Sequence, residues 1–397
     1  MSARPHRLMG LHGVAWASIF VFGIVMALLG AVLPSIVPRA GLSLADVGRL
    51  FLAMNSAMMA ASLVLGLVVD RAGLKLPLVA GALLVAVGIG LVPRAPDLAW
   101  LLAAVACLGF GGGALNGAAN TLVADLHDDP RRKASALNVL GVMFGVGALL
   151  LPFSLGALES RFGMGGLLAA GAVLCLATAA AAAVLPFPAP KQAQGWPLAH
   201  MPALLRQPLV LGLALLLFFE SGNEFAMGGY LTTLLARDFA MALDTTSYAL
   251  AGYWAALMGA RLVFARVALA VSGHALVRAC AAGAALGALV TAAAPSAPVA
   301  IAGALLTAAS LSGVFPTVLG MAAARFAERS GTVFGVLFTV ALAGGITVPW
   351  LSGLLAEATS LRWVFVVVAL NFGAILALNA AARRAARLDP IAALRHE

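Results

Sequence analysis

Long apolar stretches, separated by short polar turns, run through the chain from one end to the other. Charged residues, prolines and glycine turns divide them into twelve segments that we predict to be helices: 11–36, 46–69, 76–93, 98–126, 134–158, 164–185, 208–235, 245–269, 274–294, 297–325, 331–356 and 361–382. Crossing the roughly 30 Å hydrocarbon core of a bilayer takes about 17 to 25 residues of helix. The pattern therefore predicts an all-α membrane protein with 12 transmembrane helices.

The first apolar stretch begins near Leu11 and runs to about Ser35. It is too long for the apolar core of a signal peptide and has no small-residue cleavage site, so we expect it to be retained as a transmembrane helix.

Composition excludes a water-soluble protein. Of the 397 residues, 63% are hydrophobic and 10% are charged, and the mean hydropathy is +1.05. The net charge of +9 does not indicate nucleic-acid binding, because the basic residues lie in short loops between apolar stretches. Cys107, Cys175 and Cys280 are far apart within apolar stretches, so we expect no disulfide, no metal site and no cofactor.

The chain is predicted to consist of two related halves. A proline-rich polar segment at 186–207 separates an N-terminal six-helix bundle, 1–185, from a C-terminal six-helix bundle, 208–397. When the sequence is aligned with itself at a shift of 197 residues, three glycines and prolines of the first half match the second half. The matches are Gly147 with Gly344, Pro152 with Pro349 and Gly156 with Gly353. Such duplication is typical of secondary transporters that bind substrate between their halves.

The distribution of lysine and arginine predicts the orientation. If the N-terminus is cytoplasmic, 17 basic residues lie in cytoplasmic segments and six in outside loops, so both termini are expected to be cytoplasmic. We expect a multi-pass protein of a bacterial inner membrane. Its expected partners are the lipid bilayer, protons and a small-molecule substrate, without nucleic acid, and the protein is expected to be monomeric.

The loop after the second predicted helix contains a specific motif. Gly66, Asp70, Arg71, Gly73 and Lys75 form the pattern G-x-x-x-D-R-x-G-x-K, which resembles the signature loop of the major facilitator superfamily. The resemblance implies a fold of two pseudo-symmetric six-helix bundles, with these five residues in a gate that holds the bundles together on the cytoplasmic side. The alternative is a charged turn that only sets topology.

Three further segments resemble a narrower family, the fucose/galactose/glucose proton symporters. Residues 222–235 read G-N-E-F-A-M-G-G-Y-L-T-T-L-L, residues 136–152 read A-L-N-V-L-G-V-M-F-G-V-G-A-L-L-L-P, and residues 313–317 read G-V-F-P-T. Trp254 and Arg261 are similar to a further motif of that family, and Gly141 stands where the family has histidine. The resemblance implies proton-coupled transport of a sugar.

Two carboxylates interrupt an otherwise apolar predicted helix. Glu220 and Glu224 are four residues apart and therefore share a helix face. A charge at membrane depth costs about 2.5 to 3.5 kcal/mol and usually faces a cavity, so we predict a proton-coupling site with Arg261 as its ionic partner. Two alternatives stay open: a glutamate near the membrane surface, and a purely structural ion pair with Arg261.

Polar and aromatic side chains within the spans are candidates for substrate binding. Asn116 and Asn120 share one helix face, and amides that both donate and accept hydrogen bonds suit an uncharged polyol. The alternative is that they form hydrogen bonds between helices. Trp16 and Tyr230 can stack on a sugar ring or act as packing and interfacial residues. The remaining candidates are Asn55, Asn138, Asn223, Thr347 and Trp350.

These observations predict a secondary active transporter that works by alternating access. The substrate expected is a small polar solute, with a sugar favoured. An exporter of drugs or metabolites by proton antiport would use the same carboxylates, and a non-transporting receptor or assembly factor would need no polar residues at mid-membrane. The sequence contains neither a nucleotide-binding loop nor a nucleophile with an adjacent base, so we expect no enzymatic activity.

Overall fold

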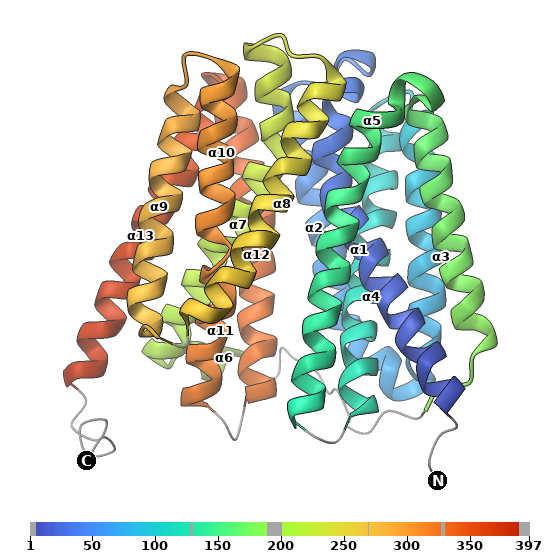
Figure 1. Cartoon of the computed structure of the whole chain (residues 1–397), viewed down its shortest axis with the longest axis vertical. Coiled ribbons are helices and arrows are strands. Elements are labelled where there is room, and N and C mark those ends of the chain that lie inside the picture. Colours follow the sequence, from blue (N-terminus) through green and yellow to red (C-terminus); the bar gives the residue numbers. More distant parts are fainter. Residues whose placement is uncertain (1–4, 128–129, 189–200, 269, 327–329, 389–397) are drawn as a thin grey trace. The chain divides into compact units, whose positions relative to one another are not determined.

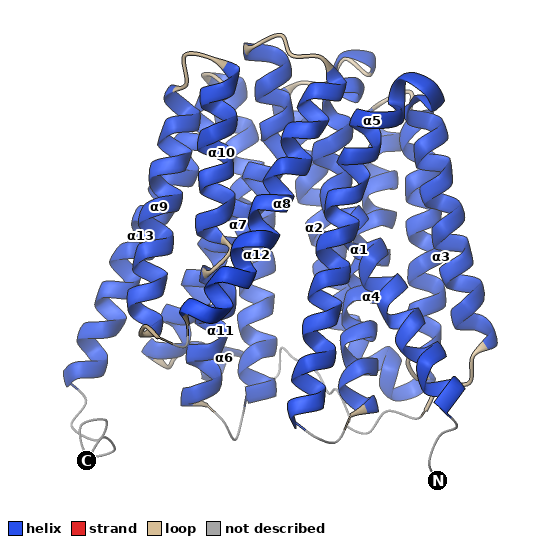
Figure 2. Ribbon diagram, viewed as in Figure 1, coloured by secondary structure: helices blue, strands red, loops and turns tan. Residues whose placement is uncertain are grey.

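The computed structural model of the protein describes residues 5–127, 130–188, 201–268, 270–326 and 330–388. These ranges are almost entirely helical and contain no strand (Figure 1, Figure 2). The long helices are α1 Pro5–Arg39, α2 Leu44–Ala72, α3 Lys75–Leu91, α4 Leu98–Leu126, α5 Pro130–Val184, α7 Pro208–Asp238, α8 Leu243–Val267, α9 Gly273–Ala293, α10 Ala297–Leu311, α11 Val314–Arg325, α12 Ser330–Ala358 and α13 Arg362–Leu388. Two short helices complete the set, the 3-10 helix η1 Val92–Arg94 and α6 Met201–Leu205.

Eleven helical stretches in the described residues are long and apolar enough to cross a membrane. One of them belongs to α5, whose 55 residues would extend about 80 Å as a straight helix, more than twice the thickness of a bilayer core. Gly163 interrupts α5 with φ 67° and ψ 158°, a conformation open to glycine but strained for other residues. The ribbon of α5 accordingly consists of two helices that run in opposite directions (Figure 1). With α5 counted as two spans, the twelve predicted transmembrane helices are confirmed.

One predicted helix is interrupted. The segment 297–325 consists of α10 and α11, separated by a turn at Ser312 and Gly313. Pro316 explains the break, because it has no N–H to donate to the carbonyl of Ser312. Gly313 permits close packing at this turn, since a β-carbon there would lie 2.8 Å from Sγ of Cys280 and 2.9 Å from the Phe264 ring.

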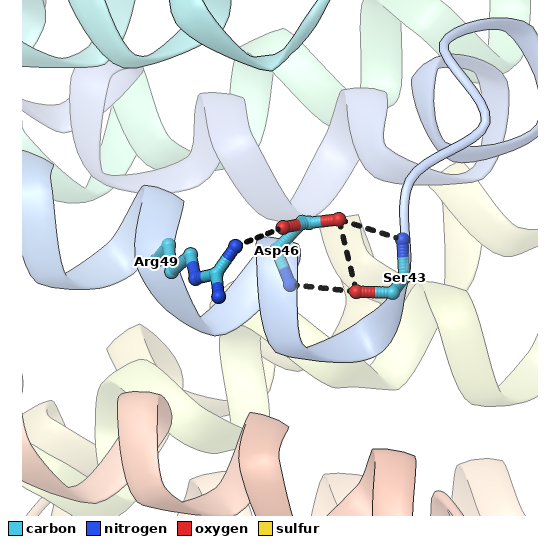
Figure 3. A network of polar contacts seen from close by, with 3 residues as sticks. All are labelled: Ser43, Asp46 and Arg49. Carbon is cyan, nitrogen blue, oxygen red and sulfur yellow. Dashed lines mark hydrogen bonds and ion pairs between the residues drawn. The ribbon is translucent and has the colours of Figure 1, made fainter.

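The start of α2 is fixed by a capping box (Figure 3). The Ser43 hydroxyl accepts a hydrogen bond from the backbone N–H of Asp46 at 3.1 Å, and the Asp46 carboxylate accepts from the backbone N–H of Ser43, also at 3.1 Å. Arg49, one turn later, donates to the other carboxylate oxygen at 2.8 Å. These contacts satisfy helix N–H groups that would otherwise lack partners at the end of a transmembrane helix.

The chain divides into two compact units. The first comprises Met1–Pro197 with Leu231–Trp254, and the second comprises Leu198–Tyr230 with Ala255–Glu397. Both α7 and α8 therefore contribute residues to each unit. The division of the sequence into halves at 186–207 stays a prediction.

In the first unit, α1 and α5 cross at two glycines. A β-carbon on Gly23 would collide with the carbonyl oxygen of Phe144, and one on Gly147 would collide with the carbonyl oxygen of Phe20. Each glycine therefore lets the other helix's backbone approach closely, as small residues do at helix contacts within membranes. α1 is also the most enclosed span described, with 78% of its most apolar window buried.

The second unit repeats this crossing between α7 and α12. A β-carbon on Gly344 would collide with the carbonyl oxygen of Phe218, and one on Gly222 would lie 2.9 Å from the carbonyl oxygen of Gly344. Gly344 is the residue that the 197-residue shift aligned with Gly147. The two halves therefore use equivalent glycines for equivalent helix crossings.

A second pair of crossings is also shared. Gly81 of α3 and Gly111 of α4 face each other in the first unit, where a β-carbon on Gly111 would lie 2.6 Å from the Gly81 carbonyl oxygen. Gly287 of α9 and Gly303 of α10 do the same in the second unit, at 2.6 Å. The internal repeat is therefore present in the packing of the helices.

Candidate functional site

α7 places three polar side chains on one face, at spacings of three and four residues. Glu220 and Asn223 are fully buried, and 12% of the Glu224 side chain is exposed. All three lie in the second unit. The structure thus encloses both carboxylates in protein, and neither lies at an exposed helix end.

Arg261 of α8 is the ionic partner of Glu224. Its Nη2 atom lies 3.9 Å from Oε2 of Glu224, and 29% of the arginine side chain is exposed. This distance is longer than a hydrogen bond, so the pair is held by charge without the bidentate geometry that makes arginine–carboxylate pairs strong. The buried Nε of Arg261 has no hydrogen-bond partner within the described residues. The guanidinium therefore has an N–H group that can still donate a hydrogen bond.

Glu220 is poorly satisfied for a buried carboxylate. Ser221 donates to its Oε2 over a long 3.4 Å, and Oε1 finds no hydrogen-bond partner in the part of the chain that is described. With so few hydrogen bonds, the ionised carboxylate is not compensated for the loss of its contacts with water. Binding a proton neutralises the group and removes this free-energy cost. The local chemistry suits a group that exchanges a proton.

Asn371 of α13 joins this cluster and was missed by sequence reasoning. Its Nδ2 donates to Oδ1 of Asn223 at 2.9 Å, while Nδ2 of Asn223 has no partner among the residues described. The available signal was an asparagine within an apolar predicted helix, the same criterion that selected the other amides. Three helices, α7, α8 and α13, therefore converge on the polar cluster.

The predicted amides of the first unit make contacts within their own helices. Nδ2 of Asn120 donates to the backbone carbonyl of Asn116 at 2.8 Å and to its Oδ1 at 3.0 Å. Asn55 is fully buried and donates to the carbonyl of Phe51 at 3.0 Å. Its Oδ1 lacks a partner among the described atoms. The side chain of Asn138 lies outside the described residues.

Tyr230 is enclosed in the second unit. Its side chain is fully buried, and the hydroxyl donates to the carbonyl oxygen of Pro349 in α12 at 2.9 Å. The Tyr230 hydroxyl therefore makes a contact between helices, as the packing interpretation expects, and a role in substrate binding stays a prediction. Thr347, also on α12, donates to the carbonyl of Ala343 at 2.8 Å, and Trp350 is half-buried.

Trp16 lies on α1 with 37% of the residue exposed. Its ring centroid is 6.1 Å from that of His12, at an interplanar angle of 60°. The structure therefore places Trp16 beside a histidine of its own helix, and its role in substrate binding stays a prediction.

The loop motif after α2 is described only in part. Gly73 has φ 71° and donates its N–H to the carbonyl of Val69 at 2.9 Å, so a glycine is needed to end the helix at this residue. Arg71 and Lys75 are exposed. The surroundings of Gly66 and the side chain of Asp70 lie outside the described residues, and the gate stays a prediction.

An aromatic cluster in the first unit is a further feature that the sequence did not single out. Phe144 of α5 lies 5.5 Å from the ring of Phe22 and 6.2 Å from that of Trp254, edge to face. Tyr253 packs against Trp254 at 5.6 Å. The Trp254 indole N–H is buried and makes no hydrogen bond to a described residue.

Comparison with known proteins agrees with this architecture. Residues 15–221, just over half of the chain, match the family profile of the Major Facilitator Superfamily. The chain belongs to this superfamily. It is accordingly a membrane transporter of small molecules and not an enzyme. No curated protein sequence matches the chain.

Solved structures of the superfamily share the whole fold. A mutant of the nucleoside transporter NupG has a TM-score of 0.79 at 12% identity, covering 95% of this chain and 99% of that one. A bacterial homologue of the human lysosomal transporter Spinster, inward-facing and occupied, has a TM-score of 0.78 at 14% identity, with 96% and 98% covered. A mutant of the Escherichia coli fucose:proton symporter FucP has a TM-score of 0.64 at 18% identity, with 94% and 98% covered. At these identities the likeness establishes the fold alone.

Proposed function

We propose that this superfamily member is a proton-coupled symporter that moves a small polar solute, with a sugar favoured, across the inner membrane by alternating access. The observation that carries the proposal is the enclosed pair Glu220 and Glu224 on α7, with Arg261 held at 3.9 Å. A carboxylate maintained at membrane depth is costly, and such residues mark ion and substrate pathways.

Coupling follows from the charge balance of this cluster. When Glu224 loses its proton, Arg261 is its counter-ion, and the loose pair allows the guanidinium to turn toward another acceptor. When Glu224 is protonated, Arg261 is released and can donate to a substrate oxygen. With both Glu220 and Glu224 ionised, the cluster with Arg261 carries a net charge of −1, and one bound proton makes it neutral, which favours the change of access in the protonated state.

Amides and hydroxyls around the carboxylates support a polar, uncharged substrate. Nδ2 of Asn223 is a hydrogen-bond donor and Oε1 of Glu220 is an acceptor, and neither atom has a partner among the described residues. A hydroxyl group satisfies both kinds of atom at once. Among proteins with this fold, one is a fucose:proton symporter and one a nucleoside transporter, and both solutes carry several hydroxyls.

The orientation belongs to the same proposal. The excess of basic residues in alternate loops supports cytoplasmic N- and C-termini. Uptake into the cell then requires proton and solute to enter together from the outside.

The proposal is tested with purified protein in proteoliposomes. Counterflow of labelled fucose, galactose, glucose, uridine and a lipophilic cation identifies the substrate class, and a pH gradient of either sign then shows the direction of coupling. We expect counterflow of a hydroxylated solute and its accumulation when the outside is acidic. Accumulation of the cation when the inside is acidic would instead establish the antiport exporter.

A further inference from the structure

Two histidines that are 115 residues apart meet at one end of the first unit. His12 lies on α1, and His127 is the residue that ends α4. Their Nε2 atoms are 3.0 Å apart, and their ring centroids are 5.1 Å apart with an interplanar angle of 56°. Both rings are partly buried. No sequence spacing reveals this pair, because the two residues belong to different helices.

The orientation of His12 is set by its own helix. Its Nδ1 lies 2.8 Å from the carbonyl oxygen of Leu8, and a carbonyl only accepts, so Nδ1 carries the proton. The neutral ring then has its lone pair on Nε2, directed at His127. Histidines that bind metals usually donate their other ring N–H to a carbonyl or a carboxylate, as Nδ1 of His12 does here, and Nε2 of His12 faces the second ring.

We propose that His12 and His127 form a binding site for a divalent transition-metal ion, such as Zn²⁺, that links α1 to α4. When each metal–nitrogen distance is about 2.0 to 2.1 Å, the two ligand nitrogens lie about 2.9 Å apart for a nitrogen–metal–nitrogen angle of about 90°. They lie about 3.3 Å apart when that angle is tetrahedral. The observed 3.0 Å falls between these values. The ion replaces the proton that the two rings share, and the backbone moves little.

The surroundings are compatible with a cation. Asp125, two residues before His127, adds a negative charge to the same end of α4 and is half-buried. The Trp16 ring is also near His12, with its centroid at 6.1 Å. The described residues hold no group of three or more His, Cys, Asp or Glu side chains arranged for a metal, so His12 and His127 are the two protein ligands assigned here. Imidazole ligands favour zinc, copper and nickel over magnesium and calcium.

The inference is independent of the proposed transport mechanism, because none of its residues belongs to the cluster on α7. A metal ion that ties α1 to α4 stabilises the first unit in this arrangement by binding only the folded state. Metal binding at this site is therefore expected whichever solute is transported.

The test uses full-length protein purified without a histidine tag and titrated with ZnCl₂ alone by calorimetry. We expect one Zn²⁺ per chain, and affinity weakened at least about tenfold in each of His12→Gln and His127→Gln, since loss of even an outer-shell partner costs about 10 to 100-fold. His274→Gln is the matched control. That histidine contacts Asn379 at 2.7 Å in the second unit, and its replacement should leave zinc binding unchanged.

A spectroscopic measurement on the unaltered protein covers the case in which a variant does not fold. Electron paramagnetic resonance of the protein with one equivalent of Cu²⁺ should show hyperfine coupling to nitrogens of two imidazoles. Unchanged zinc affinity in both variants, no zinc binding by the parent protein, or a copper spectrum with fewer than two imidazoles would each overturn the proposal.

Discussion

Replacing Glu224 by glutamine removes one charge of the ion pair on α7 and α8 and keeps the shape of the side chain. The Nη2–Oε2 distance of 3.9 Å corresponds to an attraction of about 4 kcal/mol at an effective dielectric constant of about 20. Because 29% of the Arg261 side chain is exposed, solvent screens the pair, and we expect about 1 kcal/mol of net stabilisation. The Glu224→Gln protein should therefore fold, with Tm lowered by about 2 to 4 °C.

Transport by this variant should be uncoupled. In proteoliposomes, one proton per solute allows about tenfold accumulation for each unit of pH difference, because a tenfold ratio corresponds to about 1.4 kcal/mol. We expect the parent protein to approach this ratio and Glu224→Gln to stop at a ratio of one, while counterflow of solute continues. Glu357→Gln, which alters an exposed carboxylate of α12, is the matched control and should accumulate solute normally.

The double variant separates a structural ion pair from a coupling residue. If Arg261→Gln is added to Glu224→Gln, both charges are absent, and Tm should recover part of the loss, giving a coupling energy of about 1 kcal/mol. Accumulation should not recover. If Glu224→Gln concentrates solute as the parent does, or if the double variant regains accumulation, the ion pair is structural and the coupling assignment is wrong.

Three other changes test the packing and the cluster. Asn371→Leu leaves the buried amide of Asn223 without its donor, and we expect a loss of about 1 to 3 kcal/mol, measured as a lower Tm; an unchanged Tm would show that the hydrogen bond contributes nothing. Gly344→Ala forces a methyl group against the α7 backbone and should reduce the yield of folded protein in gel filtration. Gly335→Ala on the same helix is the control, because a β-carbon there has open space, and it should behave as the parent. Equal yields of the two variants would contradict the close crossing. Ser43→Ala removes the cap of α2 and should lower the free energy of unfolding by about 0.5 to 2 kcal/mol, measured as a lower Tm. An unchanged Tm would show that the cap does not stabilise the protein.

The sequence was sufficient to predict the helices, because crossing a bilayer constrains length and composition so strongly. The predicted 98–126 is α4 itself, and the repeat read from Gly147 and Gly344 corresponds to equivalent helix crossings. The interruption at Ser312 was missed. Its cause, Pro316, was visible, but a proline near a glycine can kink a helix or end it, and hydrophobicity alone does not distinguish these outcomes.

The candidate site was predictable only where spacing along one helix defines it. Glu220 and Glu224 were found because residues four apart share a helix face. The hydrogen bond from Asn371 to Asn223 joins residues 148 apart, and the histidine contact joins residues 115 apart. Such pairs depend on which helix faces meet, which a single sequence does not encode in any local pattern. For the same reason the sequence did not reveal that the Tyr230 hydroxyl donates to the carbonyl of Pro349, 119 residues away.

Proton movement that accompanies the solute is the most direct test of the transport mechanism. Proteoliposomes containing a pH-sensitive dye and no imposed gradient are mixed with the solute identified by counterflow, in parallel for the parent and Glu224→Gln proteins. Symport predicts acidification of the interior by the parent protein on solute addition and no change with the variant. Solute entry into parent vesicles without acidification, or equal acidification with Glu224→Gln, would contradict the role assigned to the carboxylates of α7.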